Sequence, residues 1–279
     1  MKVRPFQIVK PLNENLIVQI DRSKGFYNHL HQHNEIQLSL IVKGFGKLIV
    51  GDSVHQFRDG DFFAIGSNFP HLFKTEKDQG IVEMVSLFFT RNTFGEEFFG
   101  LADLSEIKPF FDFVRDGFQL ESNLQDIADQ VIQFPKASKT TRVVLFIQLL
   151  QKLVNAEKKS LTSFKYPKEI GDLAGERMQI VFDYVLHNFQ KEIQLNTISG
   201  LVHMTPNSFC KFFKQRTNKT FFQFLIEIRI EHASQLLRNN KDLAIAEIAE
   251  LSGFKSISNF NRKFKFFKNM IPSNYRTDF

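Results

Sequence analysis

The chain has 279 residues, of which 43% are hydrophobic and 24% charged, enough for two or three compact domains. A single cysteine, Cys210, excludes an intrachain disulfide and favours a reducing compartment. No apolar run reaches the roughly 18 to 20 residues of a membrane-spanning helix, so we expect a soluble, cytoplasmic protein that does not cross a membrane.

The region from Leu16 to Thr90 consists of short apolar runs separated by glycines. Runs such as LIVQI, IQLSLIV and DFFAI have the length and composition of strands, and the glycines between them mark turns. Closely spaced strands of this kind predict a small all-β sandwich or barrel.

Two sets of residues in this region follow known motif spacings. The first set is Gly25, His31, His33, Gln37 and Gly44, and the second is Gly60, Gly66, Asn68 and His71. The region resembles the cupin family, although Gln37 stands where cupins usually have Glu, and Gly66 and Asn68 stand where Pro and Gly are usual. The resemblance implies a cupin barrel over residues 1–90.

In metal-bearing cupins the motif histidines and the glutamate hold a divalent ion, which makes His31, His33, Gln37 and His71 the candidate ligands. Gln37 has a carbonyl oxygen but no charge, and this weakens the metal hypothesis. We therefore expect no metal and no cofactor, and assign the same four side chains to an effector site. His29 and Glu35, with His31 between them, offer a second possible His-x-His-x-x-x-Glu register. Residues two apart share a strand face, so the sequence does not choose between the registers.

Residues 94–175 change to helical spacing with charged breaks. The stretch from Val143 to Val154 is rich in Val, Leu and Ile, so its helix needs a partner surface. The barrel itself is one such partner. The sequence YPKEIGDLAGE, residues 166–176, has the composition of a linker.

The positive charge lies entirely in the last part of the chain. Residues 1–175 contain 21 basic and 21 acidic residues, whereas residues 176–279 contain 15 basic and nine acidic residues, which accounts for the whole formal charge of +6. A basic segment attached to a neutral one is typical of proteins that bind nucleic acid backbones.

The basic segment contains an internal repeat of about 50 residues. Leu195, Ile198, Ser199 and Val202 recur as Ile245, Ile248, Ala249 and Ser252, and Phe209, Lys211, Phe213 and Asn218 recur as Phe260, Arg262, Phe264 and Asn269. Each copy predicts a short helix, a break and a second, basic helix, which is a helix-turn-helix. Residues 221–239 predict a long amphipathic helix between the copies.

Residues 176–279 resemble the DNA-binding domain of AraC-type transcription regulators. The resemblance is carried by Ile245-Ala246-Glu247-Ile248-Ala249, Gly253-Phe254, Ser258 to Lys265 and Pro272 to Arg276. Asn218 and Asn269 replace the usual glycines. The resemblance implies that a cupin sensor precedes this domain, and that the helical segment 91–175, with the linker, makes the chain a homodimer.

The outward positions of the second helices are the predicted contacts to double-stranded operator DNA. Thr205 and Ser256 begin these helices and are expected at phosphates. The expected base contacts are Asn207, Ser208 and Lys211 in the first copy, and Ser258, Asn259 and Arg262 in the second.

The sequence thus predicts a two-domain transcription regulator: a cupin-like barrel (1–90) followed by helices (91–175), then an all-α double helix-turn-helix (176–279). It is expected to be no enzyme, to respond to a small-molecule effector, and to associate with the nucleoid when bound; RNA polymerase is a further candidate partner. The alternatives are a metal-dependent cupin enzyme fused to a DNA-binding domain, and an architectural DNA binder without an effector.

Overall fold

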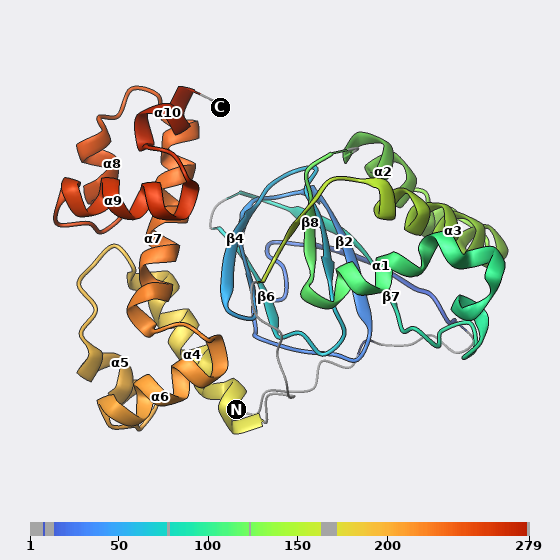
Figure 1. The fold of residues 1–279 in the computed structure, drawn as a ribbon, viewed down its shortest axis with the longest axis horizontal. Helices are drawn as coiled ribbons and strands as arrows, with labels where there is room; N and C mark the ends of the chain where they lie inside the picture. Colours follow the sequence, from blue (N-terminus) through green and yellow to red (C-terminus); the bar gives the residue numbers. More distant parts are fainter. Residues whose placement is uncertain (1–7, 9–13, 77–78, 123, 163–171, 278–279) are drawn as a thin grey trace. The chain divides into compact units, whose positions relative to one another are not determined.

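The computed structural model describes residues 8, 14–76, 79–122, 124–162 and 172–277 (Figure 1). The chain divides into two compact units, the first comprising Met1–Gly51 and His55–Asp172, the second Asp52–Val54 and Leu173–Phe279. We call them the barrel unit and the helical unit, and describe each by itself. Among the described helices, none is long and apolar enough to cross a membrane.

Two antiparallel sheets face each other in the barrel unit. Their strands are β1 (Ile17–Ser23), β2 (Ile36–Lys43), β3 (Gly46–Val50), β4 (Ser53–Phe57), β5 (Phe62–Ile65), β6 (His71–Thr75), β7 (Val82–Phe89), β8 (Phe118–Leu120) and β9 (Lys158–Ser160). The larger sheet has the order β1-β7-β2-β5-β8-β9, and the smaller one β4-β3-β6. The predicted barrel of short strands is confirmed.

Strand β2 shows why its sequence is apolar almost throughout. Successive side chains of a strand point to opposite faces, and both faces of β2 are covered. Leu38 and Leu40 join a core with the helices that follow the strands, whereas Ile41 joins the core between the two sheets. Gln37 and Ser39, which are also buried, lie on the face opposite Leu38.

The core between the sheets is filled by aromatic side chains. Phe57 and Phe63 each contact Phe73, with ring centroids 5.7 and 6.2 Å apart, and all three are almost completely buried. This part of the barrel interior is therefore occupied by protein side chains.

Helices gather on one side of the larger sheet (Figure 1). They are η1 (Phe98–Gly100), η2 (Ala102–Ile107), α1 (Lys108–Phe113), η3 (Val114–Asp116), α2 (Leu124–Val131), η4 (Phe134–Lys136) and α3 (Lys139–Asn155). Ser138 caps α3 by accepting a hydrogen bond from the Thr141 amide, and Phe146, Leu149 and Leu153 bury its inner face against the sheet. The barrel is thus one partner of this apolar face.

The sequence predicts only helices for segment 91–175, but the structure also contains the strands β8 and β9 there. These strands extend the larger sheet through pairs such as Phe63 with Gln119 and Gln119 with Lys159. Each strand has three residues, too few for a period of two to stand out against the surrounding helices. Of the predicted linker 166–176, residues 166–171 lie outside the described part of the chain.

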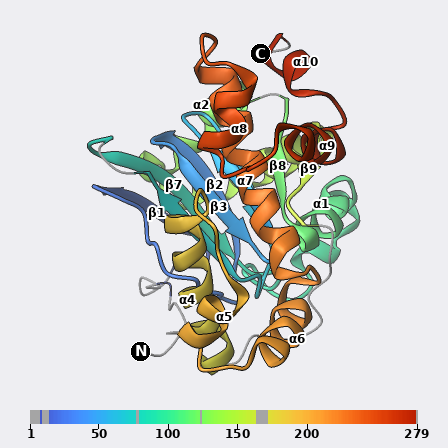
Figure 2. The same ribbon diagram turned by 90° about the vertical axis from the view of Figure 1, so that its left-hand side faces the viewer.

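The helical unit consists of α4 (Asp172–Asn188), α5 (Leu195–Leu201), α6 (Pro206–Thr217), α7 (Phe221–Asn239), α8 (Ile245–Leu251), α9 (Ile257–Lys268) and α10 (Pro272–Thr277). Figure 2 shows α5 and α6 near one end of α7, and α8 and α9 near the other. Helix α7 has the predicted limits, and Thr220 and Gln223 form a capping box at its start. The two helix-turn-helix units and their bridging helix are confirmed.

Asparagines end both second helices in a left-handed conformation. Asn218 and Asn269 have φ angles of 53° and 56°, in the left-handed region where Gly is usual and Asn is tolerated. Phe213, Phe264, Ile248 and Ala249 are buried, as expected for the cores of the two units.

Candidate functional site

The first helix-turn-helix presents the start of α6 to solvent. The hydroxyl of Thr205 caps the helix by accepting a hydrogen bond from the Ser208 amide, with an N···O distance of 3.3 Å. Pro206 follows at the first helical position, where its missing N–H has no cost. Thr205, Asn207, Ser208 and Lys211 are all exposed, whereas Phe209 and Phe213 face the core.

The second helix-turn-helix repeats this arrangement. Ser256 caps α9 by accepting from the Asn259 amide at 3.4 Å. The guanidinium of Arg262 donates to the side-chain oxygen of Asn259 at 3.1 Å, so these two side chains lie together on the outer face. Ser256, Ser258, Asn259 and Arg262 are exposed. Thus all eight residues predicted to contact DNA are accessible at the N-caps and in the first two turns of α6 and α9.

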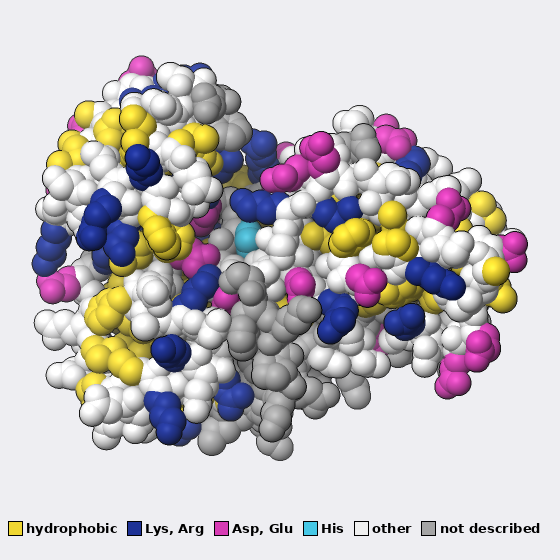
Figure 3. All heavy atoms as spheres, in the orientation of Figure 1, with side chains coloured by type: hydrophobic (Ala, Val, Ile, Leu, Met, Phe, Trp, Pro, Cys, Tyr) yellow, Lys and Arg dark blue, Asp and Glu magenta, His cyan; other side chains and the backbone are white. Residues whose placement is uncertain are grey.

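The two second helices carry positive charge and no acidic residue. Helix α6 contains Lys211, Lys214 and Arg216, and α9 contains Arg262, Lys263, Lys265 and Lys268. Figure 3 shows Lys and Arg side chains, in dark blue, spread over the helical unit. Such helices attract the phosphates of a nucleic acid and repel other cationic surfaces.

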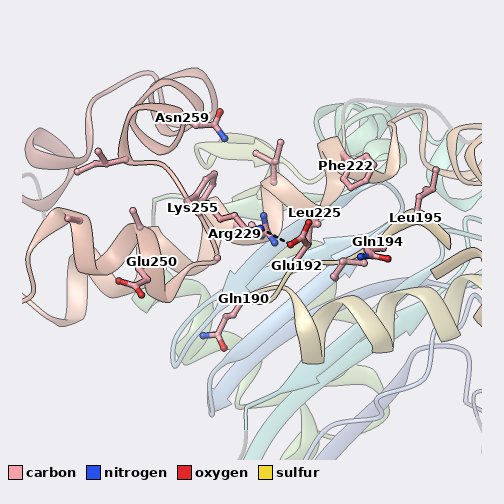
Figure 4. A pocket seen from close by; sticks show the side chains of 17 residues that line it. Gln190, Glu192, Gln194, Leu195, Phe222, Leu225, Arg229, Glu250, Lys255 and Asn259 are labelled. Atoms are coloured by element: carbon pink, nitrogen blue, oxygen red, sulfur yellow. Dashed lines mark hydrogen bonds and ion pairs between the residues drawn. The ribbon is translucent and has the colours of Figure 1, made fainter. Parts of the chain in front are cut away.

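A pocket of about 950 Å³ lies between the two helix-turn-helix units, and Figure 4 shows the side chains that line it. Arg229 of α7 donates from Nε to the carbonyl oxygen of Phe189 at 2.7 Å and from Nη2 to that of Lys191 at 2.8 Å. Beside it, the Lys255 ammonium donates to Glu192 at 2.6 Å. These contacts join the α4–α5 loop to the bridging helix α7 and to the second helix-turn-helix.

Gly253 makes this junction possible. Its φ is +83°, and a Cβ built there would lie 2.7 Å from the carbonyl oxygen of Phe189 and 2.9 Å from Nε of Arg229. A larger residue at position 253 would therefore push the α4–α5 loop away from the second helix-turn-helix. The sequence analysis assigned no role to Glu192, Arg229 or Lys255. The sequence feature that could have indicated this junction is Gly253, in the turn between α8 and α9.

The barrel unit contains a buried histidine cluster formed by His31, His33 and His71. One ring nitrogen from each lies within 4.8 Å of the others, and the three residues are at most 6% exposed. His31 and His71 face each other through a pair of backbone hydrogen bonds of 3.1 and 2.9 Å. Gln37 lies beside them, with its oxygen 3.2 Å from Nε2 of His33 and 3.0 Å from Nε2 of His71.

The structure decides between the two registers that the sequence left open. His31, His33, Gln37 and His71 come together, whereas the side chain of His29 is exposed. Glu35 is buried, but its carboxylate approaches His33 at Nδ1, 3.9 Å away, on the ring edge opposite Gln37.

Backbone carbonyls set the tautomer of each imidazole. The Nδ1 atoms of His31, His33 and His71 lie 2.8, 2.9 and 2.8 Å from the carbonyl oxygens of His29, Glu35 and Phe69. Burial lowers the pKa of His31 to about 3 and also lowers the pKa values of His33 and His71, so the rings are neutral. Each Nδ1 therefore carries the proton, and each Nε2 carries a lone pair.

This donor set fits a divalent metal. Three imidazole nitrogens oriented by carbonyls on their other ring nitrogen are the usual arrangement of histidine ligands, and the oxygen of Gln37 would supply a neutral fourth ligand. The same atoms can also be satisfied without metal. If the amide of Gln37 is turned over, its NH₂ group donates to both Nε2 atoms, and the hydroxyl of Ser39, 2.8 Å away, donates to its oxygen.

Comparison with known proteins agrees with both parts of the fold. Residues 198–278 match a family model described as a helix-turn-helix domain, and residues 17–88 match a cupin domain model. These matches define a cupin domain followed by a helix-turn-helix domain. The helix-turn-helix domain is of the AraC type, as its motifs predicted.

Bacterial proteins are among the relatives that match this chain. The chain is 26% identical over 252 residues to an uncharacterized HTH-type transcriptional regulator of Staphylococcus aureus (strain COL), covering 88% of this chain and 32% of that protein. It is 22% identical over 268 residues to the uncharacterized HTH-type transcriptional regulator YdeC of Bacillus subtilis, covering 92% and 89%. The chain thus spans about a third of the staphylococcal relatives.

Among the solved structures that match, some matches extend over most of the chain. ToxT from Vibrio cholerae O395 is 18% identical to this protein, with a TM-score of 0.37 and coverage of 94% of this chain and 97% of that one.

Proposed function

We propose that this protein is a sequence-specific DNA-binding transcription regulator whose affinity for its operator depends on a small-molecule effector in the barrel unit. The observation that carries the proposal is the pair of basic, acid-free helices α6 and α9 on one bridging helix. Two such helices read successive major-groove segments when they lie about one helical turn of DNA apart, roughly 34 Å.

The start of each second helix and its outward side chains have separate tasks in this proposal. The capped helix starts at Thr205 and Ser256 bind phosphates, because the N-terminal amides and the helix dipole favour an anion. Side chains one or two turns further, above all Arg262, read base edges. The junction of Arg229, Glu192 and Lys255 keeps the two readers in a constant spacing.

The effector would act by shifting a population. A ligand changes DNA affinity only if it binds one arrangement of the protein better than another. Because Phe57, Phe63 and Phe73 fill the core between the sheets, we place the effector beside His31, His33, Gln37 and His71.

The experiment that tests the main proposal is selection of binding sites from random DNA with the full-length protein, followed by titration of the selected duplex with candidate metabolites. A recurrent pair of sequence elements about 10 base pairs apart is expected. Binding without sequence preference would favour the architectural alternative, and a specific affinity that no small molecule alters would remove the effector.

A metal-dependent cupin enzyme fused to the DNA-binding domain is the second candidate function. The three converging imidazole nitrogens favour it, whereas the neutral amide of Gln37 in place of a carboxylate disfavours it, because the ligand set then has no negative charge. Elemental analysis of purified protein discriminates between the two. We expect no stoichiometric metal, and one equivalent of a first-row metal would support the second candidate.

We also propose that α3 makes the chain a homodimer. Its outward side chains between Lys139 and Lys152 include Thr141, Val144, Gln148 and Gln151, all exposed and uncharged, and Val144 is 54% exposed. A helix face without charges meets its own copy without repulsion between like charges, and Val144 adds an exposed apolar side chain to it. Light scattering of the full chain should give twice the monomer mass, and a monomer at micromolar concentration would contradict the proposal.

A further inference from the structure

The outer face of α9 carries an aromatic side chain that the core does not use. Phe266 is 75% exposed, more than any other large hydrophobic side chain in the described part of the chain. Phe260 and Phe264 already form the buried side of the helix. Its ring contacts that of the half-buried Phe267, with centroids 5.1 Å apart, and most of its apolar surface stays accessible to a partner.

Helix geometry places Phe266 among the residues that we propose read DNA. Successive residues of an α-helix turn by about 100°, so the direction of Phe266 lies within about 40° of those of both Asn259 and Arg262. These two side chains are joined by a hydrogen bond of 3.1 Å on the outer face. Phe266 therefore continues their row by one further turn.

Charge identifies the partner of this row. Four basic residues and no acidic one lie on α9, so the surface around Phe266 is complementary to a polyanion. In the major groove of DNA, the apolar group that a side chain can contact is the C5 methyl of thymine, and phenylalanine is among the residues that contact it.

We propose that Phe266 contacts the C5 methyl of a thymine in the half-site read by the second helix-turn-helix, and so determines its specificity. This inference rests on the proposed function. The rise of about 1.5 Å per residue puts Phe266 roughly 6 Å beyond Arg262 along the helix. At 3.4 Å per base pair, this distance corresponds to one or two steps from the base that Arg262 reads.

The first helix-turn-helix differs at the matching position. The 51-residue offset that relates Lys211 to Arg262 relates Gln215 to Phe266, and Gln215 is exposed. An amide in one reader and a phenyl ring in the other recognise different groups. The thymine preference therefore belongs to one half-site.

The test uses the full-length protein and a duplex selected from random DNA. Binding sites are selected with the natural protein, with Phe266→Ala and with Arg262→Ala. The thymine that Phe266 contacts is identified as the base whose preference weakens in the Phe266→Ala selection. It should lie one or two positions from the base whose preference changes in the Arg262→Ala selection. That thymine is then replaced by uracil, which lacks only the methyl group. Loss of one methyl contact should reduce the affinity of the natural protein about threefold to fivefold.

The Phe266→Ala variant should bind the thymine and uracil duplexes equally. Phe45→Ala, which removes another exposed phenyl ring, 42% exposed in the barrel unit, should remain sensitive to uracil like the natural protein. If Phe266→Ala selects the same sites and loses the same affinity on uracil, the inference is wrong, and a protein partner is the better explanation of the exposed ring. If the natural protein selects no sequence at all, the proposed function fails first.

Discussion

At the scale of single residues, chemistry concentrates in two places that use opposite physical principles. Arg262 and Lys265 on α9 are exposed and charged, so in the proposed function their interaction energy with DNA arises when the nucleic acid removes them from water. His31, His33 and His71 are buried, neutral and already hydrogen-bonded to backbone carbonyls. The first group is ready for a polyanion, and the second for a small ligand or a cation.

Replacing Arg262 tests the base-reading assignment. Arg262→Ala should weaken binding to the selected duplex by about 1 to 3 kcal/mol and remove the preference for one guanine, because it deletes a bidentate contact. Arg262→Lys keeps the charge but not the planar fork, so it should retain non-specific affinity and lose most of the discrimination. Unchanged affinity and base preference in Arg262→Ala would show that this side chain does not read the operator.

Acid should destabilise the barrel unit through its histidines. Burial lowers the pKa values of His31, His33 and His71 in the folded protein, so the unfolded chain binds more protons below about pH 6.5. Stability is therefore fully present above that pH and is lost as the pH falls toward the folded values, by at most about 1.4 kcal/mol per pH unit for each histidine. Urea unfolding of the barrel at pH 7, 6 and 5, with a chelator present, measures this loss, and constant stability would contradict it.

At the scale of elements, the sequence predicts long helices better than strand pairing. The limits of α7 follow from amphipathic spacing and from its capping box, both of which are local. The strands β8 and β9 were missed because their pairing partners lie far away in the chain. The close approach of Gly253 to Phe189 is likewise a contact between distant segments.

Replacing Phe264 tests the core of the second helix-turn-helix. Its ring is completely buried and lies 5.5 Å from Phe260 and 5.3 Å from Tyr275, centroid to centroid. Phe264→Ala should destabilise the unit by roughly 3 to 5 kcal/mol, with loss of DNA binding and a lower melting temperature by calorimetry. Lys265→Ala, the exposed neighbour, should leave the melting temperature unchanged. A Phe264→Ala variant with the natural melting temperature would move this ring out of the core.

At the scale of the whole molecule, sensing and DNA binding are assigned to different units. Residues 176–279 hold the whole formal charge of +6, and α4 packs into the same unit, since Phe182 and Phe224 stack with centroids 5.2 Å apart. A fragment that keeps α4 complete therefore begins at Asp172.

The fragment 172–279 should bind the selected duplex without any effector. Its affinity should fall with salt, with a log-log slope near −0.9 for each phosphate neutralised. The fragment 1–171 should bind effector and dimerise but ignore DNA. Fluorescence titrations of the duplex at several salt concentrations measure both fragments. A folded 172–279 fragment without salt-dependent binding would overturn the regulator proposal and favour the enzyme alternative.

The sequence by itself determined the two fold classes, the repeated helix-turn-helix, the limits of α7 and the exposed positions of α6 and α9. These features follow from periodicity and capping, which depend on residues within a few positions of one another. Tertiary structure decided that His33 and Gln37, rather than His29 and Glu35, join His31 and His71, and that Glu192, Arg229 and Lys255 meet beside Gly253. Residues two apart share a strand face, so the choice between His29 and His33 required contacts between distant segments, such as that of Gln37 with His71 across 34 residues, which no local pattern encodes.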